Sequence, residues 1–122
     1  MLDHIGLRTR QIQAMLAFYE AVLAPLGFSK LKDFGVAAGF GREGQHPLWI
    51  GQVQGDAAAS SVHLALTAAN REAVDAFHKA ALAHGGTDNG PPGLRPQYHA
   101  RYYAAFVLDP DGNNLEAVCH TG

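Results

Sequence analysis

The sequence predicts an α+β protein made of two βαβββ modules, with a curved mixed sheet and helices on its outer face. Each half of the chain reads as a strand-like run, an amphipathic helix ending at glycine, and further strand-like runs. A shift of 59 positions also places His4 on His63 and Gly27 on Gly86. A repeat of this length indicates two similar units related by pseudo-two-fold symmetry.

Length and composition indicate a single domain over residues 1–122, with module 1 at about 1–54 and module 2 at about 61–120. The chain is 48% hydrophobic and 16% charged, as in ordinary globular proteins, which excludes a disordered chain. A net charge of −2 gives no electrostatic reason to expect nucleic acid or a membrane surface as partner. The polar N-terminus does not resemble a signal peptide, so a cytoplasmic location is the default expectation.

In the first module, apolar residues at helical spacing predict a helix over residues 11–26. Gly27 accepts the left-handed conformation that ends a helix. Pro25 removes a backbone donor and therefore predicts an irregular last turn. Strands are predicted over residues 2–8, 28–33, 36–41 and 48–54.

In the second module, Asn70 is a good N-cap for a helix that runs to about residue 84. The residues expected to face inward are Val74, Phe77, Ala81 and Leu82. Strands are predicted over residues 61–67, 86–89, 101–108 and 113–120. The sequence DPDG at 109–112 is typical of a type I turn, which would join the last two strands as a hairpin. Residues 55–61 read as a linker, and 90–96 are too rich in proline and glycine for regular structure.

Strand parity brings three potential metal ligands to one face of the sheet. His4 and His63 alternate with the large aliphatic residues of their strands, so they lie on the face away from the helices. Glu116 can face the same concavity from the last strand. Two imidazoles and one carboxylate suit a divalent ion with open coordination positions. The alternative is a metal-free pocket in which Glu116 pairs with Arg8 or Arg101.

Three motifs carry a resemblance to a known family. The stretches DHIGL, HLAL and LDPDGNNLEAV resemble the strand motifs of the vicinal-oxygen-chelate superfamily, which includes glyoxalase I, fosfomycin-resistance thiol transferases, extradiol dioxygenases and bleomycin-binding proteins. The resemblance covers nearly the whole chain. It implies one divalent ion (Zn, Ni, Mn, Fe or Co) bound by His4, His63 and Glu116, with Glu116 catalytic. It also implies a homodimer in which modules of different chains can pair.

The chain departs from glyoxalase I at the fourth ligand. That enzyme carries a second glutamate in the last strand of its first unit, whereas Trp49 aligns with Glu116 here and Gln52 is the nearest possible ligand. The resemblance implies isomerase or lyase chemistry on a small substrate chelated through neighbouring oxygens. Dioxygenase or thiol-transferase chemistry remains open within the superfamily. The rival from another class is a metal-free protein that binds a drug or metabolite.

Candidate substrate contacts lie in the stretch QYHARYYAAF and in one strand of the first module. Arg101 suits an anionic substrate group, and His99 or Tyr103 suits substrate binding or proton movement. An equally open interpretation leaves them as ordinary strand and surface residues. Trp49 either stacks on a ligand or packs in the core. Cys119, the single cysteine, is expected to be a small buried hydrophobic residue.

Overall fold

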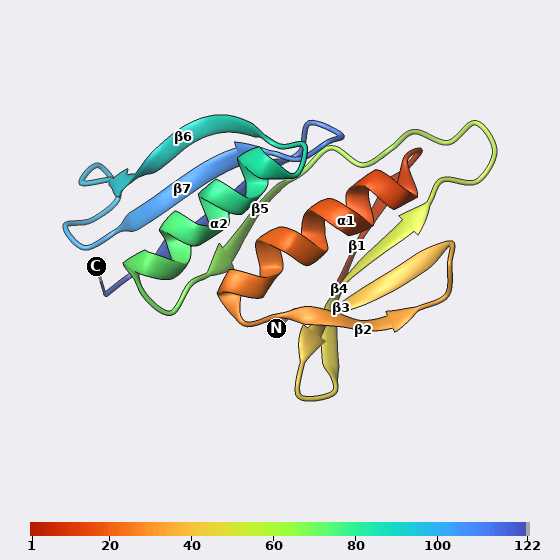
Figure 1. The fold of residues 1–122 in the computed structure, drawn as a ribbon, viewed down its shortest axis with the longest axis horizontal. Helices are drawn as coiled ribbons and strands as arrows, with labels where there is room; N and C mark the ends of the chain where they lie inside the picture. The colour runs from red at the N-terminus through yellow and green to blue at the C-terminus, as the bar shows by residue number, and fades with distance from the viewer. Residues whose placement is uncertain (122) are drawn as a thin grey trace.

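The computed structural model describes residues 1–121, and within them the βαβββ order occurs twice (Figure 1). The first module consists of β1 (Ile5–Thr9), α1 (Ile12–Leu23), the short 3₁₀ helix η1 (Ala24–Leu26), β2 (Ser29–Asp33), β3 (Ala37–Arg42) and β4 (Gln45–Gln52). The second consists of β5 (His63–Thr67), α2 (Arg71–Ala83), β6 (Thr87–Leu94), β7 (Tyr103–Leu108) and β8 (Asn114–Cys119). The predicted fold class is confirmed.

Each module forms its own four-stranded mixed sheet. Sheet A has the strand order β1-β4-β3-β2 and sheet B the order β5-β8-β7-β6. In both, the first strand pairs parallel to the last, and the other pairs are antiparallel. The modules are therefore repeats in topology as well as in element order.

The two helices lie side by side in front of the sheets, α1 over sheet A and α2 over sheet B (Figure 1). One apolar cluster fills the space between helices and sheets, and its largest fully buried members include Phe18, Tyr19, Phe40 and Phe77. The opposite face of each sheet carries no helix. Among residues 1–121, no helix is long and apolar enough to span a bilayer.

The first helix ends as Pro25 predicts. The α-helix stops at Leu23, and the next three residues form a 3₁₀ turn with Pro25 in its first turn. Gly27 follows with φ of 89°, in the left-handed region that glycine adopts without steric cost. The predicted helix and its irregular last turn are thus confirmed.

The second helix begins at its predicted cap. The Asn70 side chain accepts a hydrogen bond from the backbone N–H of Ala73 at 2.8 Å. Val74, Phe77 and Ala81 are buried, but the prediction for Leu82 is wrong, because that side chain is 47% exposed. The buried stripe is narrower than the apolar letters indicated.

The prediction of an irregular loop over residues 90–96 is wrong for residues 90–94 and holds for Arg95 and Pro96. Strand β6 runs to Leu94 and pairs with β7, with register shifts at Gly90. It forms the outer edge of sheet B, where a strand has a free side and a proline without an N–H is tolerated. Bulges take up the remaining irregularity.

The predicted DPDG hairpin joins β7 to β8 and also ties the modules together. Gly112 N–H donates to Asp109 O at 2.9 Å, closing the turn. The Asp109 carboxylate is 4% exposed and accepts hydrogen bonds from Asn113 and from the hydroxyl of Tyr19 on α1. Asn113 Oδ1 in turn accepts from the N–H of Val62 at the start of β5. These bonds fix β5 beside β8.

Candidate functional site

The helix-free faces of the two sheets share one register. Gly6 of β1 pairs with Trp49 of β4, and Ala65 of β5 pairs with Glu116 of β8. Trp49 therefore occupies in sheet A the place that Glu116 occupies in sheet B. The described residues thus provide an indole where glyoxalase I would need its fourth ligand.

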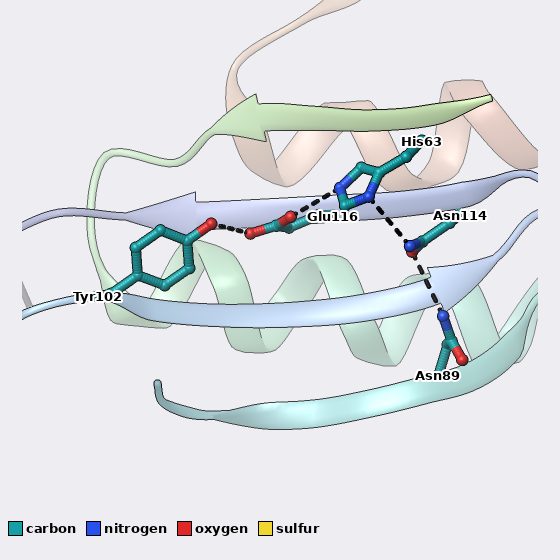
Figure 2. A network of polar contacts seen from close by, with 5 residues as sticks. All are labelled: His63, Asn89, Tyr102, Asn114 and Glu116. Atoms are coloured by element: carbon teal, nitrogen blue, oxygen red, sulfur yellow. Dashed lines mark hydrogen bonds and ion pairs between the residues drawn. The ribbon is translucent and has the colours of Figure 1, made fainter. Parts of the chain in front are cut away.

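Glu116 lies at the centre of the helix-free face of sheet B (Figure 2). Its side chain is 3% exposed, and its Oε1 lies 2.9 Å from Nε2 of His63. Its Oε2 accepts a hydrogen bond from the hydroxyl of Tyr102. A carboxylate with these two donors remains stable in a buried setting. The alternative pairing with Arg8 or Arg101 does not form within residues 1–121, where the ion-pair partner of Glu116 is His63 and the Arg101 guanidinium donates to the backbone oxygen of Thr121.

The polar contacts continue from His63 along the sheet (Figure 2). Asn114, the residue opposite His63 in the β5–β8 pair, contacts Nδ1 of His63 through its Nδ2 at 3.2 Å. Asn89 of β6 donates through its Nδ2 to Oδ1 of Asn114 at 3.4 Å. A line of five side chains therefore runs from Tyr102 to Asn89.

The surroundings of Glu116 raise the pKa of Tyr102 to about 12. Burial is the main cause, followed by the hydrogen bond to Glu116 and the charge of that carboxylate. The phenol thus keeps its proton near neutral pH and acts as a hydrogen-bond donor to Glu116.

Aromatic and imidazole rings surround these polar groups. The Phe106 ring meets His63 edge to face, with centroids 6.2 Å apart. Tyr102 packs against His120, and His120 stacks on His99 with Nδ1 and Nε2 2.9 Å apart. Of the predicted substrate contacts, His99 is therefore the one that the structure brings against Tyr102, with ring centroids 5.4 Å apart.

His4 lies in the other module, just before β1. Its side chain is 59% exposed, and its Nδ1 lies 2.7 Å from Oδ1 of Asp3. Within residues 1–121, no three His, Cys, Asp or Glu side chains gather closely enough to hold a metal ion. The single chain brings His63 and Glu116 together, and the three-ligand site of His4, His63 and Glu116 stays a prediction.

The other predicted substrate contacts lie elsewhere. The Arg101 guanidinium donates to the backbone oxygen of Thr121 at 2.9 Å. Tyr103 lies on the face covered by α2, where its hydroxyl donates to Asp75 at 2.7 Å, and this bond raises its pKa. Trp49 stacks on Phe34 in sheet A, with ring centroids 6.1 Å apart. Cys119 is 1% exposed, as expected.

Sequence reasoning missed Tyr102 and Asn114. Strand parity could have predicted both positions, because residues two apart in a strand lie on the same face. Asn114 precedes Glu116 by two positions and therefore lies on its face. Tyr102 precedes Phe106, the residue opposite Glu116, by four positions and therefore lies on the same face of the strand. Tyr103 lies on the other face. Weighing both tyrosines by parity would have selected Tyr102.

Comparisons with known proteins place the chain in a family. The model of the Glyoxalase/Bleomycin resistance protein/Dioxygenase superfamily matches residues 1–117. Among curated proteins, none matches the chain. A glyoxalase/bleomycin resistance protein from Albidiferax ferrireducens T118 is 28% identical, with a TM-score of 0.82 over 95% of this chain and 96% of that one.

Two further solved structures share the fold. A family enzyme from Burkholderia phytofirmans PsJN is 24% identical, with a TM-score of 0.71 over 97% of both chains. Glyoxalase I from Zea mays is 22% identical, with a TM-score of 0.74 over 98% of this chain and 46% of that one. Since the family model spans both modules and ends just after Glu116, the chain belongs to the Glyoxalase/Bleomycin resistance protein/Dioxygenase superfamily.

Proposed function

We propose that this protein is a metal-dependent enzyme that acts on a small substrate at the helix-free face of sheet B, with isomerase or lyase chemistry. The observation that carries the proposal is the pair formed by Glu116 and His63. A carboxylate that is 3% exposed at the centre of an otherwise helix-free face has its Oε1 2.9 Å from an imidazole nitrogen. Perturbed or buried ionisable groups of this kind concentrate at functional sites.

The donor set supports a divalent cation. Glu116 Oε1 and His63 Nε2 point at each other from neighbouring strands, so both donors can reach one ion. Imidazole and carboxylate together bind several first-row metals, which leaves zinc, nickel, manganese, iron and cobalt as candidates. A bound ion would polarise one of two neighbouring substrate oxygens and stabilise developing negative charge.

The remaining groups have separate roles in this proposal. Tyr102 holds Glu116 Oε2 through its hydroxyl, which leaves Oε1 for the metal. The edge of Phe106 packs on the imidazole of His63 and limits water at that side. His99, next to Tyr102, is the candidate for contacting substrate or moving a proton.

The third donor, His4, is proposed to come from a second copy of the chain. His63 and Glu116 lie in sheet B, whereas His4 precedes sheet A and is largely exposed. A symmetric dimer that faces sheet A of one copy with sheet B of the other would form two equal sites. Each site would combine His4 of one copy with His63 and Glu116 of the other.

Metal analysis of untagged protein tests the proposal. Wild-type protein dialysed against Zn²⁺, Ni²⁺, Mn²⁺, Fe²⁺ or Co²⁺ is expected to retain about one ion per chain. His63→Ala and Glu116→Ala are expected to retain none. His84→Ala serves as the control, because His84 is exposed at the end of α2 and contacts only the backbone oxygen of Ala80 among the described residues. Wild-type protein that binds none of these ions would overturn the proposal.

Mixing variants tests the shared site. His4→Ala and Glu116→Ala chains are unfolded together and refolded, so that mixed dimers form. In a mixed dimer one site carries both changes and the other carries neither, so about one quarter of all sites is expected to bind metal. Binding that stays at zero after mixing, with each parent dimeric, would contradict a site shared between chains, and metal retained by His4→Ala alone would place His4 outside the site.

A second candidate function is metal-free binding of a small molecule. The observation that favours it is that Glu116 already has two hydrogen-bond partners without any ion. In that case the same dialysis leaves the protein without metal. Ligand binding would then depend on the rings around Glu116, and Phe106→Ala would weaken it while Glu116→Ala would not abolish it.

A further inference from the structure

The hydrogen bonds beside Glu116 run in one direction (Figure 2). Asn89 Nδ2 donates to Asn114 Oδ1 at 3.4 Å, which leaves Asn114 Nδ2 facing Nδ1 of His63 at 3.2 Å. The opposite ring nitrogen, Nε2, lies 2.9 Å from Glu116 Oε1. An ionised carboxylate only accepts, so the direction from Asn89 to Glu116 is consistent at every step.

This direction determines the tautomer of a neutral His63. The ring carries one N–H, and the nitrogen that accepts from Asn114 cannot also hold that hydrogen. The proton therefore sits on Nε2 and points at Glu116. Glu116, which only accepts, and Asn114, whose Oδ1 is engaged by Asn89, favour this state together.

We propose that Asn114 is a positioning residue that sets the tautomer of His63 together with Glu116, and that the amide pair Asn89–Asn114 reverses its direction when Nε2 binds an ion. The second half rests on the proposed function. If His63 ligated an ion through the lone pair of Nε2, this nitrogen would give its proton to solvent and Nδ1 would take one from solvent. Nδ1–H then needs an acceptor, which Asn114 supplies by turning its amide and presenting Oδ1.

An amide pair suits this reversal. Each amide carries a donor and an acceptor at nearly equal distances, so a half-turn exchanges them without moving the backbone. After Asn114 turns, its Nδ2 faces Asn89, which turns in the same way and accepts through Oδ1. Both contacts are longer than the bond between His63 and Glu116, and Asn89 is exposed, so little is lost in turning.

The matching histidine of the first module lacks this device. His4 Nδ1 contacts the Asp3 carboxylate, which only accepts, so the His4 proton stays on Nδ1 and Nε2 is bare. Pro47, which directly precedes Leu48 as Asn114 precedes Leu115, offers no side-chain donor or acceptor. His4 is thus fixed in the form that a ligand needs, whereas His63 is held in the other form until an ion arrives.

Nuclear magnetic resonance on metal-free, ¹⁵N-labelled protein tests the tautomer directly. Correlation of the ring nitrogens with the ring C–H protons distinguishes the two neutral forms, and His63→Gln assigns the signal. Wild-type His63 is expected in the Nε2–H form. Asn114→Asp, which offers only acceptors, is expected to place a proton on Nδ1 while Glu116 keeps the one on Nε2. Asn114→Leu removes one of the two partners that favour the Nε2–H form and is expected to weaken the preference, and Asn89→Ala is expected to weaken it less.

Zinc titration of the same variants tests the reversal. Bound Zn²⁺ is expected to convert wild-type His63 to the Nδ1–H form. Asn114→Leu is expected to weaken zinc binding about tenfold, the usual effect of losing a partner of a ligating histidine, and Asn114→Asp is expected to restore or strengthen it. Gln13→Leu, an amide-to-leucine change on the exposed face of α1, is the control and leaves both readouts unchanged.

The outcomes separate the two proposals. A wild-type His63 in the Nδ1–H form without metal, or an Nδ1 that stays without a proton in Asn114→Asp, would overturn the inference. A tautomer that follows Asn114 in a protein that binds no zinc would overturn the metal site and the reversal with it, and would support the selection of the tautomer. Thermal unfolding of every variant verifies that each one is folded.

Discussion

The helix-free faces of sheets A and B are built on the same register and hold opposite chemistry. At the centre of sheet A, Trp49 lies between Gly6 and Gly39 on the neighbouring strands. At the centre of sheet B, Glu116 lies between Ala65 and Phe106. In sheet A the aromatic ring, Trp49, lies on β4 and its neighbour on β3 is Gly39. In sheet B the carboxylate, Glu116, lies on β8 and the aromatic ring, Phe106, lies on the neighbouring strand β7. The repeat supplies the position, and the residue placed there decides between ring packing and a polar centre.

The hairpin turns of the two sheets differ in the same way. In sheet B, the turn between β7 and β8 is organised by the buried carboxylate of Asp109. In sheet A, β3 and β4 are joined by Glu43 and Gly44, both with positive φ, and no buried side chain. The turn of sheet B therefore holds its module to α1 of the other module, while the turn of sheet A closes a hairpin alone.

The largest expected effect comes from the turn of sheet B. Asp109→Ala is expected to lower the free energy of unfolding by about 3–5 kcal/mol, because it leaves the buried hydroxyl of Tyr19 and the side chain of Asn113 without their acceptor. Urea denaturation measures it. Glu43→Ala in the turn of sheet A is the comparison and is expected to have no comparable effect. Equal losses in both turns would contradict the difference between the modules.

The second prediction exchanges the two central residues for leucine. Glu116→Leu is expected to abolish metal retention and to lower the free energy of unfolding by about 1–3 kcal/mol, because it leaves the Tyr102 hydroxyl and the His63 imidazole without their acceptor. Trp49→Leu is expected to keep the metal and lose about 1–2 kcal/mol of stability as its ring contacts disappear. Metal retained in Glu116→Leu would show that the metal binds somewhere other than at Glu116.

Much of this arrangement follows from sequence because it depends on short-range rules. Strand parity placed His63 and Glu116 on one face, and the turn chemistry of DPDG placed β8 after β7. The cap at Asn70 and the 3₁₀ turn at Pro25 were equally local. The matching register of the two sheets also confirms a repeat that rests on few identical letters.

The features that the sequence did not predict depend on tertiary contacts between segments far apart in the chain. The edge position of β6 allows a strand through a proline-rich stretch, and nothing in residues 90–96 states that one side of the strand is free. Leu82 has helical spacing, but the buried side of α2 holds Val74, Phe77 and Ala81, and Leu82 beside them is 47% exposed.

A third prediction concerns the glycine beside Trp49. A Cβ added at Gly39 would lie 3.0 Å from the indole ring, so Gly39→Ala is expected to displace the ring and lower stability by about 1–2 kcal/mol. Trp49 is the single tryptophan, so a shift in fluorescence emission reports the displacement directly. Gly6→Ala, where an added Cβ meets nothing within 4 Å, is the matched control on the other neighbouring strand. An unchanged emission in Gly39→Ala would contradict the close packing of the ring on this strand.

The smallest expected effect tests the polar centre of sheet B by pH. The pKa of Tyr102 is raised to about 12 in the folded protein, from an ordinary value of 10.0, mainly by burial and by Glu116. The unfolded chain thus loses this proton first, and the stability contributed by the protonated hydroxyl is complete below about pH 10 and lost as the pH rises toward 12. Tyr102→Phe is expected to cost about 1 kcal/mol at neutral pH and to flatten the alkaline decline. Tyr98→Phe, whose exposed ring lies 4.8 Å from that of Tyr102, is the control and keeps the wild-type curve. If the alkaline loss of stability were unchanged in Tyr102→Phe, the Tyr102 hydroxyl would not interact with Glu116. The contrast between the polar centre of sheet B and the aromatic ring at the centre of sheet A would then depend on His63 alone.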